Sequence, residues 1–247
     1  MLKITALGVT LGGKEILTDI NFTLKPHSLT AIIGRNGSGK STVVSAINGM
    51  VSYTGQITFA GQDIRMLSQR EKAKLISVLP QTLNAPHITV EELVKMGRNP
   101  YIDIGHRFTP QDTLAVENAI TYMELADKKH QYVDSLSGGE RQKAYLAMIL
   151  AQQTRLMVLD EPATYMDISC ENQFMQTLKS LQKNSHKTIV TVMHNLSTAV
   201  RYADRIVVMD KGRVIFEGTT EECLEKQIIE NTFGVKKYIS DGEIFFG

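Results

Sequence analysis

The chain has 247 residues, which is enough for one large domain with a buried core, or for a domain that carries an insert. Hydrophobic residues make up 43% and charged residues 21% of it, as in an ordinary globular protein, and the net charge of +1 argues against binding DNA or RNA through their phosphates. The longest apolar stretch, residues 145–151, is far shorter than the roughly 20 residues that a membrane-spanning helix needs. We therefore expect a globular protein that does not cross a membrane and binds no nucleic acid.

The N-terminal residues and the cysteines indicate the compartment. The chain enters an alternating strand pattern directly after Met1, without the charged and then apolar segments of a signal peptide. Cys170 and Cys223 are too few and too far apart for a disulfide framework or a zinc site. Both observations favour a reducing, cytosolic location.

The first quarter of the chain predicts two kinds of strand. Residues 2–24 hold two short alternating runs with a turn at Gly12-Gly13, and residues 56–59 are another strand candidate, so we expect a small antiparallel sheet. The continuous apolar run at residues 29–33 is instead typical of a strand that is buried on both faces. A helix is predicted next, over residues 42–48, and Gly49 would end it.

In the second half of the chain, buried strands alternate with helices. Apolar runs like the first one lie at residues 156–159, 188–193 and 206–209. Helical patterns lie at residues 139–152 and 169–183. This alternation predicts a parallel α/β sheet.

Two segments do not follow the alternation. Residues 82–135 have helical patterns at 90–96 and 112–125 but no buried strand, so we interpret them as a mainly helical insert. The predicted organisation is a single domain over residues 1–247, in which 1–81 and 136–247 form the core and 82–135 the insert. After a hairpin turn at 210–212, the tail is predicted to contain one helix ending near Phe233 and then a hairpin around Asp241.

A phosphate-binding loop is predicted between the buried strand at 29–33 and the helix that follows. The pattern G-x-x-x-x-G-K-[ST] is matched, in this strand–loop–helix context, by Gly34, Arg35, Asn36, Gly37, Ser38, Gly39, Lys40 and Ser41, followed by Thr42. The glycines allow backbone N–H groups to surround phosphate oxygens, and the helix N-terminus adds positive potential. We expect Lys40 to reach the β- and γ-phosphates of ATP and Ser41 to bind Mg²⁺.

Two carboxylates follow the next buried strand. Asp160 and Glu161 come directly after residues 156–159, where a P-loop ATPase needs a second site for the metal. Asp160 would hold Mg²⁺, directly or through water. Glu161 would polarise the attacking water, a role that is worth roughly 10²–10⁴-fold in rate. The sequence thus predicts ATP hydrolysis with Mg²⁺ as cofactor.

Two further polar residues lie at the ends of predicted strands. His194 follows the strand at 188–193, where a contact with the γ-phosphate is geometrically reasonable. Gln81 follows Val78-Leu79-Pro80, a strand end broken by proline, and could bridge the metal to the helical insert. Taken alone, each of these residues is more simply explained as incidental.

Residues 136–142 (LSGGERQ) resemble the signature motif of ATP-binding cassette (ABC) ATPases, and they lie upstream of the two carboxylates, as in that family. Ser137, the flexible Gly138 and Gly139, and the N-terminus of the predicted helix form an anion site. Glu140 is common in the family at its position. In the family this site completes the ATP pocket of the opposite subunit, so the resemblance implies a head-to-tail homodimer that sandwiches two nucleotides.

The same resemblance implies the ABC ATPase fold and further roles. That fold has a P-loop core with a parallel sheet, an N-terminal antiparallel β subdomain and a helical signature subdomain. Gln81 corresponds to the Q-loop residue, His194 to the switch histidine, and residues 163–167 to the D-loop with Asp167 at its acidic position. The implied catalytic and metal-binding sets are then Glu161, His194, Gln81, Ser41 and Asp160.

The resemblance covers essentially the whole chain and also indicates a subfamily of ABC ATPases. Residues 96–101 (MGRNPY), 161–167 (EPATYMD), 194–196 (HNL) and 199–205 (AVRYADR) are similar to the ATPase subunits of importers for ferric siderophores, haem or cobalamin. This resemblance implies a peripheral subunit at the cytoplasmic face of the cell membrane. Its partners would be two membrane-spanning permease subunits, which receive cargo from a separate substrate-binding protein.

One residue departs from the family pattern. ABC ATPases usually stack the adenine on an aromatic residue near the first strand, and here Leu11 occupies that position. Stacking of a base on an aromatic ring is worth roughly 1–3 kcal/mol, or about 5- to 150-fold in affinity. Leucine can still pack its apolar side chain on the adenine. We therefore expect the loss of ATP affinity to lie at the lower end of that range.

Other functions compete with import. A soluble ABC ATPase of a non-transport process, such as cluster assembly, is the main alternative, because relatives of that kind are close to this chain in size. The chain has neither the long coiled coil of chromosome-type relatives nor the second cassette of translation-factor relatives. A cassette that only binds nucleotide is disfavoured by Lys40, Asp160, Glu161 and His194. The segment at 97–101 favours the importer.

Overall fold

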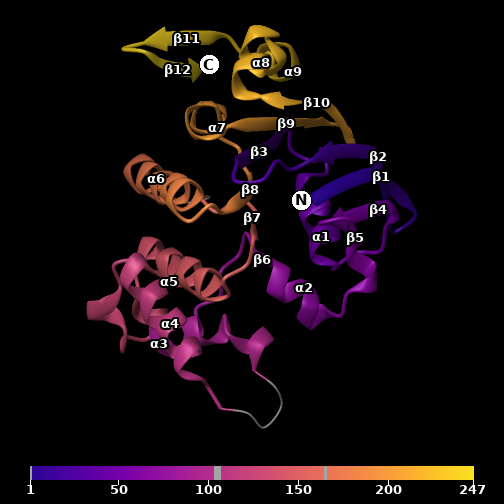
Figure 1. Ribbon diagram of the computed structural model, residues 1–247. Helices are drawn as coiled ribbons and strands as arrows, with labels where there is room; N and C mark the ends of the chain where they lie inside the picture. The colour runs from indigo at the N-terminus through magenta and orange to yellow at the C-terminus, as the bar shows by residue number, and fades with distance from the viewer. Residues whose placement is uncertain (1, 103–106, 164–165) are drawn as a thin grey trace.

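A six-stranded sheet runs through the middle of the computed structural model, which describes residues 2–102, 107–163 and 166–247 (Figure 1). In spatial order its strands are β10 (Arg213–Thr219), β9 (Arg205–Asp210), β3 (Leu29–Gly34), β8 (Thr188–Val192), β7 (Leu156–Leu159) and β6 (Ile76–Leu79). All are parallel except β10, which pairs antiparallel with β9. Every residue of β3, β7 and β8 is buried, as their continuous apolar runs predicted.

An antiparallel sheet covers one face of the central sheet. Its strands, in spatial order, are β2 (Lys14–Thr23), β1 (Leu2–Leu11), β4 (Thr54–Phe59) and β5 (Gln62–Asp63). The core on this side also contains helix α1 (Lys40–Asn48), and side chains such as Leu7, Val43 and Val158 pack together in it. The predicted antiparallel sheet is therefore present, and it stands against the strand–loop–helix unit that begins at β3.

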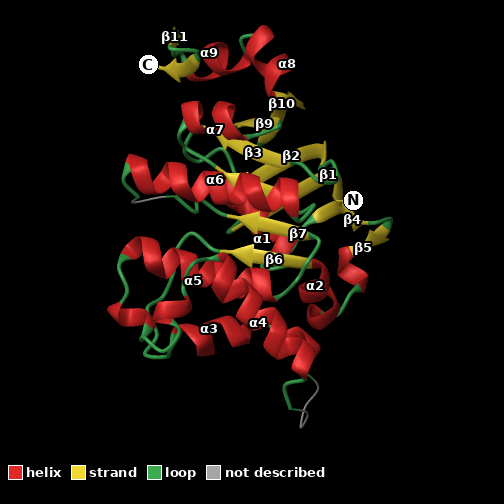
Figure 2. Ribbon diagram, turned by 60° about the vertical axis from the view of Figure 1, so that its left-hand side comes forward, coloured by secondary structure: helices red, strands yellow, loops and turns green. Residues whose placement is uncertain are grey.

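Helices cover the opposite face (Figure 1). They are α5 (Gly138–Ala151), α6 (Ile168–Asn184) and α7 (Leu196–Tyr202). Helices α3 (Val90–Met96) and α4 (Pro110–Tyr122) pack against α5 at the end of the molecule farthest from the C-terminus (Figure 2). Helices are present where the sequence predicted them within residues 82–135, while the division of the chain into a core and an insert remains a prediction. Among the described residues, no helix combines the length and the apolar character that a membrane span requires.

Two parts of the fold differ from the sequence-based expectation. The tail contains two short helices, α8 (Thr220–Glu225) and α9 (Ile228–Phe233), rather than one, because the chain turns through a left-handed conformation at Gln227 (φ +52°). Helix α2 (Gln69–Leu75) was not predicted; it is short and polar, and a capping box between Ser68 and Glu71 begins it. The hairpin around Asp241 is confirmed as strands β11 (Lys237–Ser240) and β12 (Glu243–Phe246).

The MGRNPY segment, residues 96–101, lies within the predicted insert and packs it against α5. A Cβ on Gly97 would lie 2.1 Å from the Met148 carbonyl oxygen, so only glycine allows α3 and α5 to come this close. The Arg98 side chain is buried, and its Nε donates to Asp112 Oδ1 at 2.9 Å. Its Nη1 donates to the Ala151 carbonyl oxygen, at 2.7 Å, at the end of α5. Arg98 therefore links α3, α4 and α5 through one buried guanidinium group.

Replacing Arg98 with methionine is expected to lower the free energy of unfolding by about 3 kcal/mol, because the buried Asp112 carboxylate would lose its cationic partner. Urea denaturation of the purified protein measures this change. Arg213→Met, at an exposed position on β10, is the matched control and should change stability by less than about 0.5 kcal/mol. Equal stabilities of the two variants would contradict the role of Arg98.

Candidate functional site

The predicted phosphate-binding loop connects β3 to α1, at the carboxyl end of the central sheet. Gly37 and Gly39 have left-handed backbone conformations, with φ of +77° and +97°. A Cβ on Gly34 would lie 2.4 Å from the Met209 carbonyl oxygen, whereas a Cβ on Gly37 would meet no atom within 4 Å. The loop therefore packs tightly against β9 at Gly34 and leaves open space over Gly37, where backbone N–H groups can face a phosphate group.

Lys40 is the first residue of α1, and its side chain lies under the loop. The residue is 5% exposed, and Nζ donates to the carbonyl oxygens of Gly34 (2.9 Å) and Arg35 (3.2 Å). Burial lowers the pKa of Lys40, and the nearby carboxylates of Glu161 and Asp160 act in the opposite direction. The ammonium group is thus held at the loop by neutral carbonyls, in reach of any phosphate that the loop binds.

A hydroxyl and a carboxylate converge beside the loop. Ser41 Oγ donates to Asp160 Oδ1 at 3.1 Å, across the gap between α1 and the end of β7. Burial raises the pKa of Asp160, and the hydrogen bond from Ser41 partly offsets this. Mg²⁺ prefers oxygen ligands and is commonly bound by one or two carboxylates together with substrate phosphates, so this pair fits a magnesium ion. Within the described ranges no group of three His, Cys, Asp or Glu is placed to hold a metal ion without other ligands.

The three side chains predicted to be catalytic meet at Glu161. One of its carboxylate oxygens accepts a hydrogen bond from Gln81 Nε2 at 2.5 Å, and the other lies 2.5 Å from His194 Nε2. These residues follow β7, β6 and β8, whose carboxyl ends lie side by side in the sheet. Glu161 also has a left-handed backbone conformation, φ +49°, which is unfavourable for a non-glycine residue and is often retained at functional sites.

One cavity of about 570 Å³ contains most of these groups. Its lining residues are Lys14, Ile16, Asn36, Gly37, Gly39, Lys40, Ser41, Thr42, Gln81, Glu161 and His194. The predicted loop residues Gly34, Arg35 and Ser38 do not line it, and neither does Leu11, which is 44% exposed.

Sequence reasoning missed Lys14 and Ile16, which line the cavity beside the loop. Leu11 pairs with Lys14 across the β1–β2 hairpin, so the predicted base-contacting position and the lining residues belong to the same turn. The signal that could have found Lys14 is the Gly12-Gly13 turn itself. A tight turn at that point places Lys14 opposite Leu11, next to the residue predicted to contact the base.

The signature residues begin helix α5. Ser137 is its N-cap and forms a capping box with Glu140, whose carboxylate accepts from the Ser137 backbone N–H at 3.0 Å. An ion pair with Lys128 (2.9 Å), together with the bonds from Ser137, lowers the pKa of Glu140 to about 2. A Cβ on Gly138 or Gly139 would meet no atom within 4 Å, so the first turn of α5 is open to an approaching group.

The signature lies apart from the phosphate-binding loop. A second cavity, of about 550 Å³, is lined by Ser137, Gly138 and Gly139 and contains no residue of the loop, although Gln81 lines both cavities. Asp167 also lines it and caps α6 by accepting from the Cys170 N–H at 2.9 Å. The predicted D-loop residues Thr164 and Tyr165 lie outside the described part of the chain. Within one chain, the structure brings the carboxylates and His194 to the loop but not the signature.

Comparison with known proteins identifies the family of this chain. The family model for ABC transporters matches residues 17–164. The chain belongs to the ABC transporter family. A probable siderophore transport system ATP-binding protein of Bacillus subtilis, YusV, is 36% identical over 97% of this chain and 88% of its own length. The iron(3+)-hydroxamate import ATP-binding protein FhuC of the same organism is 35% identical, over 93% of this chain and 86% of its own.

Comparison with solved structures agrees with this family assignment. The dimeric structure of MJ0796, a bacterial ABC transporter cassette, is 26% identical in sequence and has a TM-score of 0.76, covering 89% of this chain and 99% of the cassette. The expected ABC ATPase fold is therefore confirmed. Because the ATP-binding subunits of ABC importers hydrolyse ATP, membership of this family also confirms the expected enzymatic class, an ATPase that binds nucleotide.

Proposed function

We propose that this chain is the ATPase subunit of an ABC importer that takes up an iron complex, either a ferric siderophore or haem, or cobalamin. The siderophore and iron-hydroxamate systems of its relatives support this function over a soluble role such as cluster assembly. The subunit would lie peripherally at the cytoplasmic face of the cell membrane, bound to two permease subunits that a substrate-binding protein supplies with cargo.

The residues at the loop would bind and orient ATP. Lys40 Nζ would exchange its carbonyl partners for the β- and γ-phosphates, which backbone N–H groups of the loop would also contact. Ser41 and Asp160, whose oxygens converge, would hold Mg²⁺. When bound there, Mg²⁺ would neutralise charge on the phosphates. This arrangement would direct the γ-phosphate toward the ends of β7 and β8.

The residues beyond the loop would act on the attacking water. Glu161 would accept a hydrogen bond from the water and take up its proton as it attacks. His194 would contact the γ-phosphate and, through its contact with Glu161, keep that carboxylate in place. Gln81 contacts Glu161 and lines both cavities, so it would connect the metal site to the insert.

The observation that carries the proposed mechanism is the separation of the signature from the loop. Ser137, Gly138 and Gly139 border one cavity, with Glu140 next to them in the first turn of α5, and the phosphate-binding loop borders another. One chain alone would therefore leave the γ-phosphate without the signature. A second copy in head-to-tail orientation would supply it, with Asp167 of the D-loop beside the contact. The dimeric state of the related cassette supports this homodimer.

Replacing Leu11 with tyrosine is expected to raise ATP affinity about fivefold, because an aromatic ring would stack on the adenine. Isothermal titration with ATP, in a Glu161→Gln background that prevents turnover, measures the change. Leu114→Tyr adds the same ring at an exposed position of α4 and should have no effect. Unchanged affinity in Leu11→Tyr would count against this placement of the base.

Uptake of labelled cargo tests the proposed function. The chromosomal gene of the source organism would carry Glu161→Gln or, as a control, Glu221→Gln at an exposed position of α8. Cells with the first variant should lose energy-dependent uptake of one of three cargoes, a ferric siderophore, haem or cobalamin. Cells with the control should retain it. Normal uptake of all three by the Glu161→Gln cells would overturn the proposed cargo class.

A further inference from the structure

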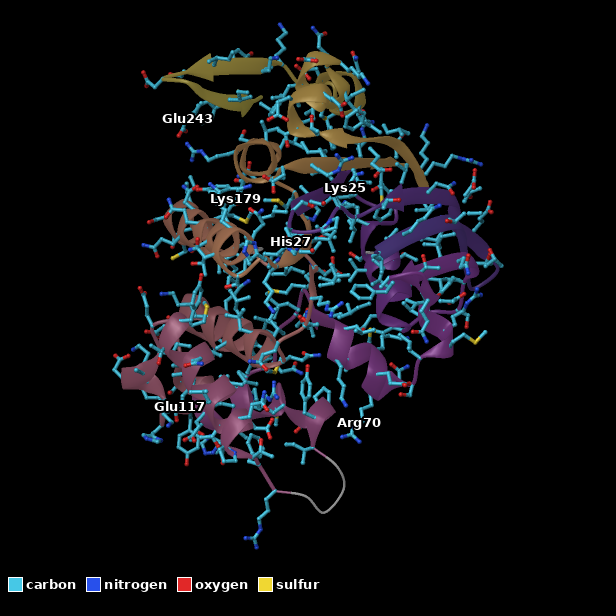
Figure 3. All side chains as sticks on the ribbon, viewed as in Figure 1. Lys25, His27, Arg70, Glu117, Lys179 and Glu243 are labelled. Carbon is cyan, nitrogen blue, oxygen red and sulfur yellow. The ribbon has the colours of Figure 1, made fainter. Side chains whose placement is uncertain are left out.

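A third cavity, of about 380 Å³, lies at the amino edge of the central sheet, where β3, β7 and β8 begin. This edge is opposite the phosphate-binding loop, which follows the carboxyl end of β3. Figure 3 shows His27, one of the lining residues, between helix α6 and the antiparallel sheet. The cavity is therefore separate from the nucleotide site and shares none of its lining residues.

Four of the side chains around this cavity are basic. His27 precedes β3, Arg155 precedes β7, and His186 and Lys187 precede β8. The lining includes no carboxylate among the residues that the structure describes, although Asp and Glu together nearly equal Lys and Arg in the whole chain. A concave surface with one sign of charge concentrates ions of the opposite sign.

Lys187 is the most constrained of these groups. Its Nζ donates to the Thr154 carbonyl oxygen at 2.5 Å, so its described partner is neutral. The side chain is partly buried, and burial lowers the pKa of Lys187. An anion in the cavity would supply the counter-charge that the surrounding residues do not provide.

The two imidazoles contact each other, and the His27 ring is held by the backbone. His27 Nδ1 donates to the His186 carbonyl oxygen at 2.5 Å, and the two rings meet edge to face with centroids 5.5 Å apart. The backbone of both residues is left-handed, with φ of +54° and +49°. Gln182 Nε2 donates to the His27 carbonyl oxygen at 2.6 Å. The bond to the His186 carbonyl fixes the His27 ring, and the edge-to-face contact places the His186 ring beside it. Arg155 and Lys187 line the same cavity.

We propose that this cavity binds a small anion that carries a phosphate group. The planar guanidinium of Arg155 and the ammonium of Lys187 are the groups that proteins use most for phosphate oxygens. The volume lies within the range of about 300–1,000 Å³ that is usual for small-molecule sites, and Pro26 and Ala60 add an apolar wall for an organic moiety. The ligand would span the starts of β7 and β8, the strands whose far ends carry Glu161 and His194.

Titration with inorganic phosphate and with glycerol phosphate, at constant ionic strength, tests this site. The full chain would be saturated with Mg²⁺ and a non-hydrolysable ATP analogue, so that neither probe can enter the phosphate-binding loop. Calorimetry would give the affinity, and the side-chain NMR signals of His27 and His186 would report where the probe binds. Tighter binding of glycerol phosphate than of inorganic phosphate would indicate a phosphorylated metabolite; the reverse would indicate free phosphate.

Arg155→Gln is the decisive variant because Arg155 is exposed and its loss should not unfold the protein. We expect it to weaken binding of both probes by about five- to tenfold, while Arg213→Gln on β10 leaves binding unchanged. His186→Asn should weaken binding as well and keeps the site testable if Arg155→Gln proves unstable. Absence of binding, or equal affinities in Arg155→Gln and Arg213→Gln, would overturn the proposal. These experiments do not measure nucleotide hydrolysis or transport. A failure of the proposed importer function can therefore be distinguished from a failure of this anion site.

Discussion

Replacing Glu161 with glutamine is expected to lower kcat for ATP hydrolysis by about 10²–10⁴-fold while leaving the affinity for ATP nearly unchanged. Glutamine has nearly the same shape and can still contact His194 and Gln81, but its amide cannot accept a proton from the attacking water. The carboxylate stands where Gln81 and His194 converge, next to the phosphate-binding loop, so its loss should affect the chemical step. Steady-state phosphate release and ATP titration measure the two quantities separately.

The same variant tests the dimer. Without hydrolysis, bound ATP should keep two chains together, so light scattering should find a Glu161→Gln dimer with ATP and Mg²⁺ and mainly monomer without them. Glu221→Gln removes a charge from an exposed position of α8 and should behave like the unaltered protein. Hydrolysis at the normal rate in Glu161→Gln would show that another group activates the water.

Replacing Lys40 with alanine is expected to reduce ATP affinity by about 100-fold. A hydrogen bond to a charged group contributes roughly 1.5–3 kcal/mol, and at the lower end of this range two such contacts with phosphate oxygens are worth about that factor. The buried Lys40 ammonium already lies at the loop, with two carbonyl oxygens as partners that phosphates can replace. Calorimetric titration with ATP measures the loss.

Lys183→Ala, at an exposed position near the end of α6, is the matched control for Lys40→Ala. It removes the same charge far from the loop and should leave ATP affinity within about twofold. Together the two site variants separate the steps, because Lys40→Ala should prevent binding whereas Glu161→Gln should prevent hydrolysis after binding. An unchanged ATP affinity in Lys40→Ala would contradict the proposed role of the loop in binding ATP.

Features that depend on local pattern were predictable from the sequence. The apolar runs of β3, β7 and β8 are buried on both faces. Each such run can be recognised as a buried strand from its own residues, without knowledge of its neighbours in the sheet. The polar residues that follow these strands could be expected to meet, because the carboxyl ends of parallel strands share one edge. Glu161 and His194 do meet there.

Features that depend on long-range packing or on unusual backbone conformations were not predictable. The break between α8 and α9 occurs at Gln227, a residue without the helix-ending signal of glycine or proline. The contribution of Ile16 to the cavity depends on how the β1–β2 hairpin folds back over the loop. The separation of Ser137 from the loop depends on where helix α5 packs in the fold, which spacing along the chain does not reveal.

The most direct test of the proposed function is to recover Glu161→Gln from detergent-solubilised membranes in the presence of ATP and to identify the proteins that copurify. The proposed importer subunit should bring down a polytopic permease, in a complex that Lys40→Ala does not form in response to ATP. That permease would then identify the cargo class. Recovery of a soluble scaffold or of ribosomes, without any integral membrane protein, would contradict the importer and leave a soluble ATPase.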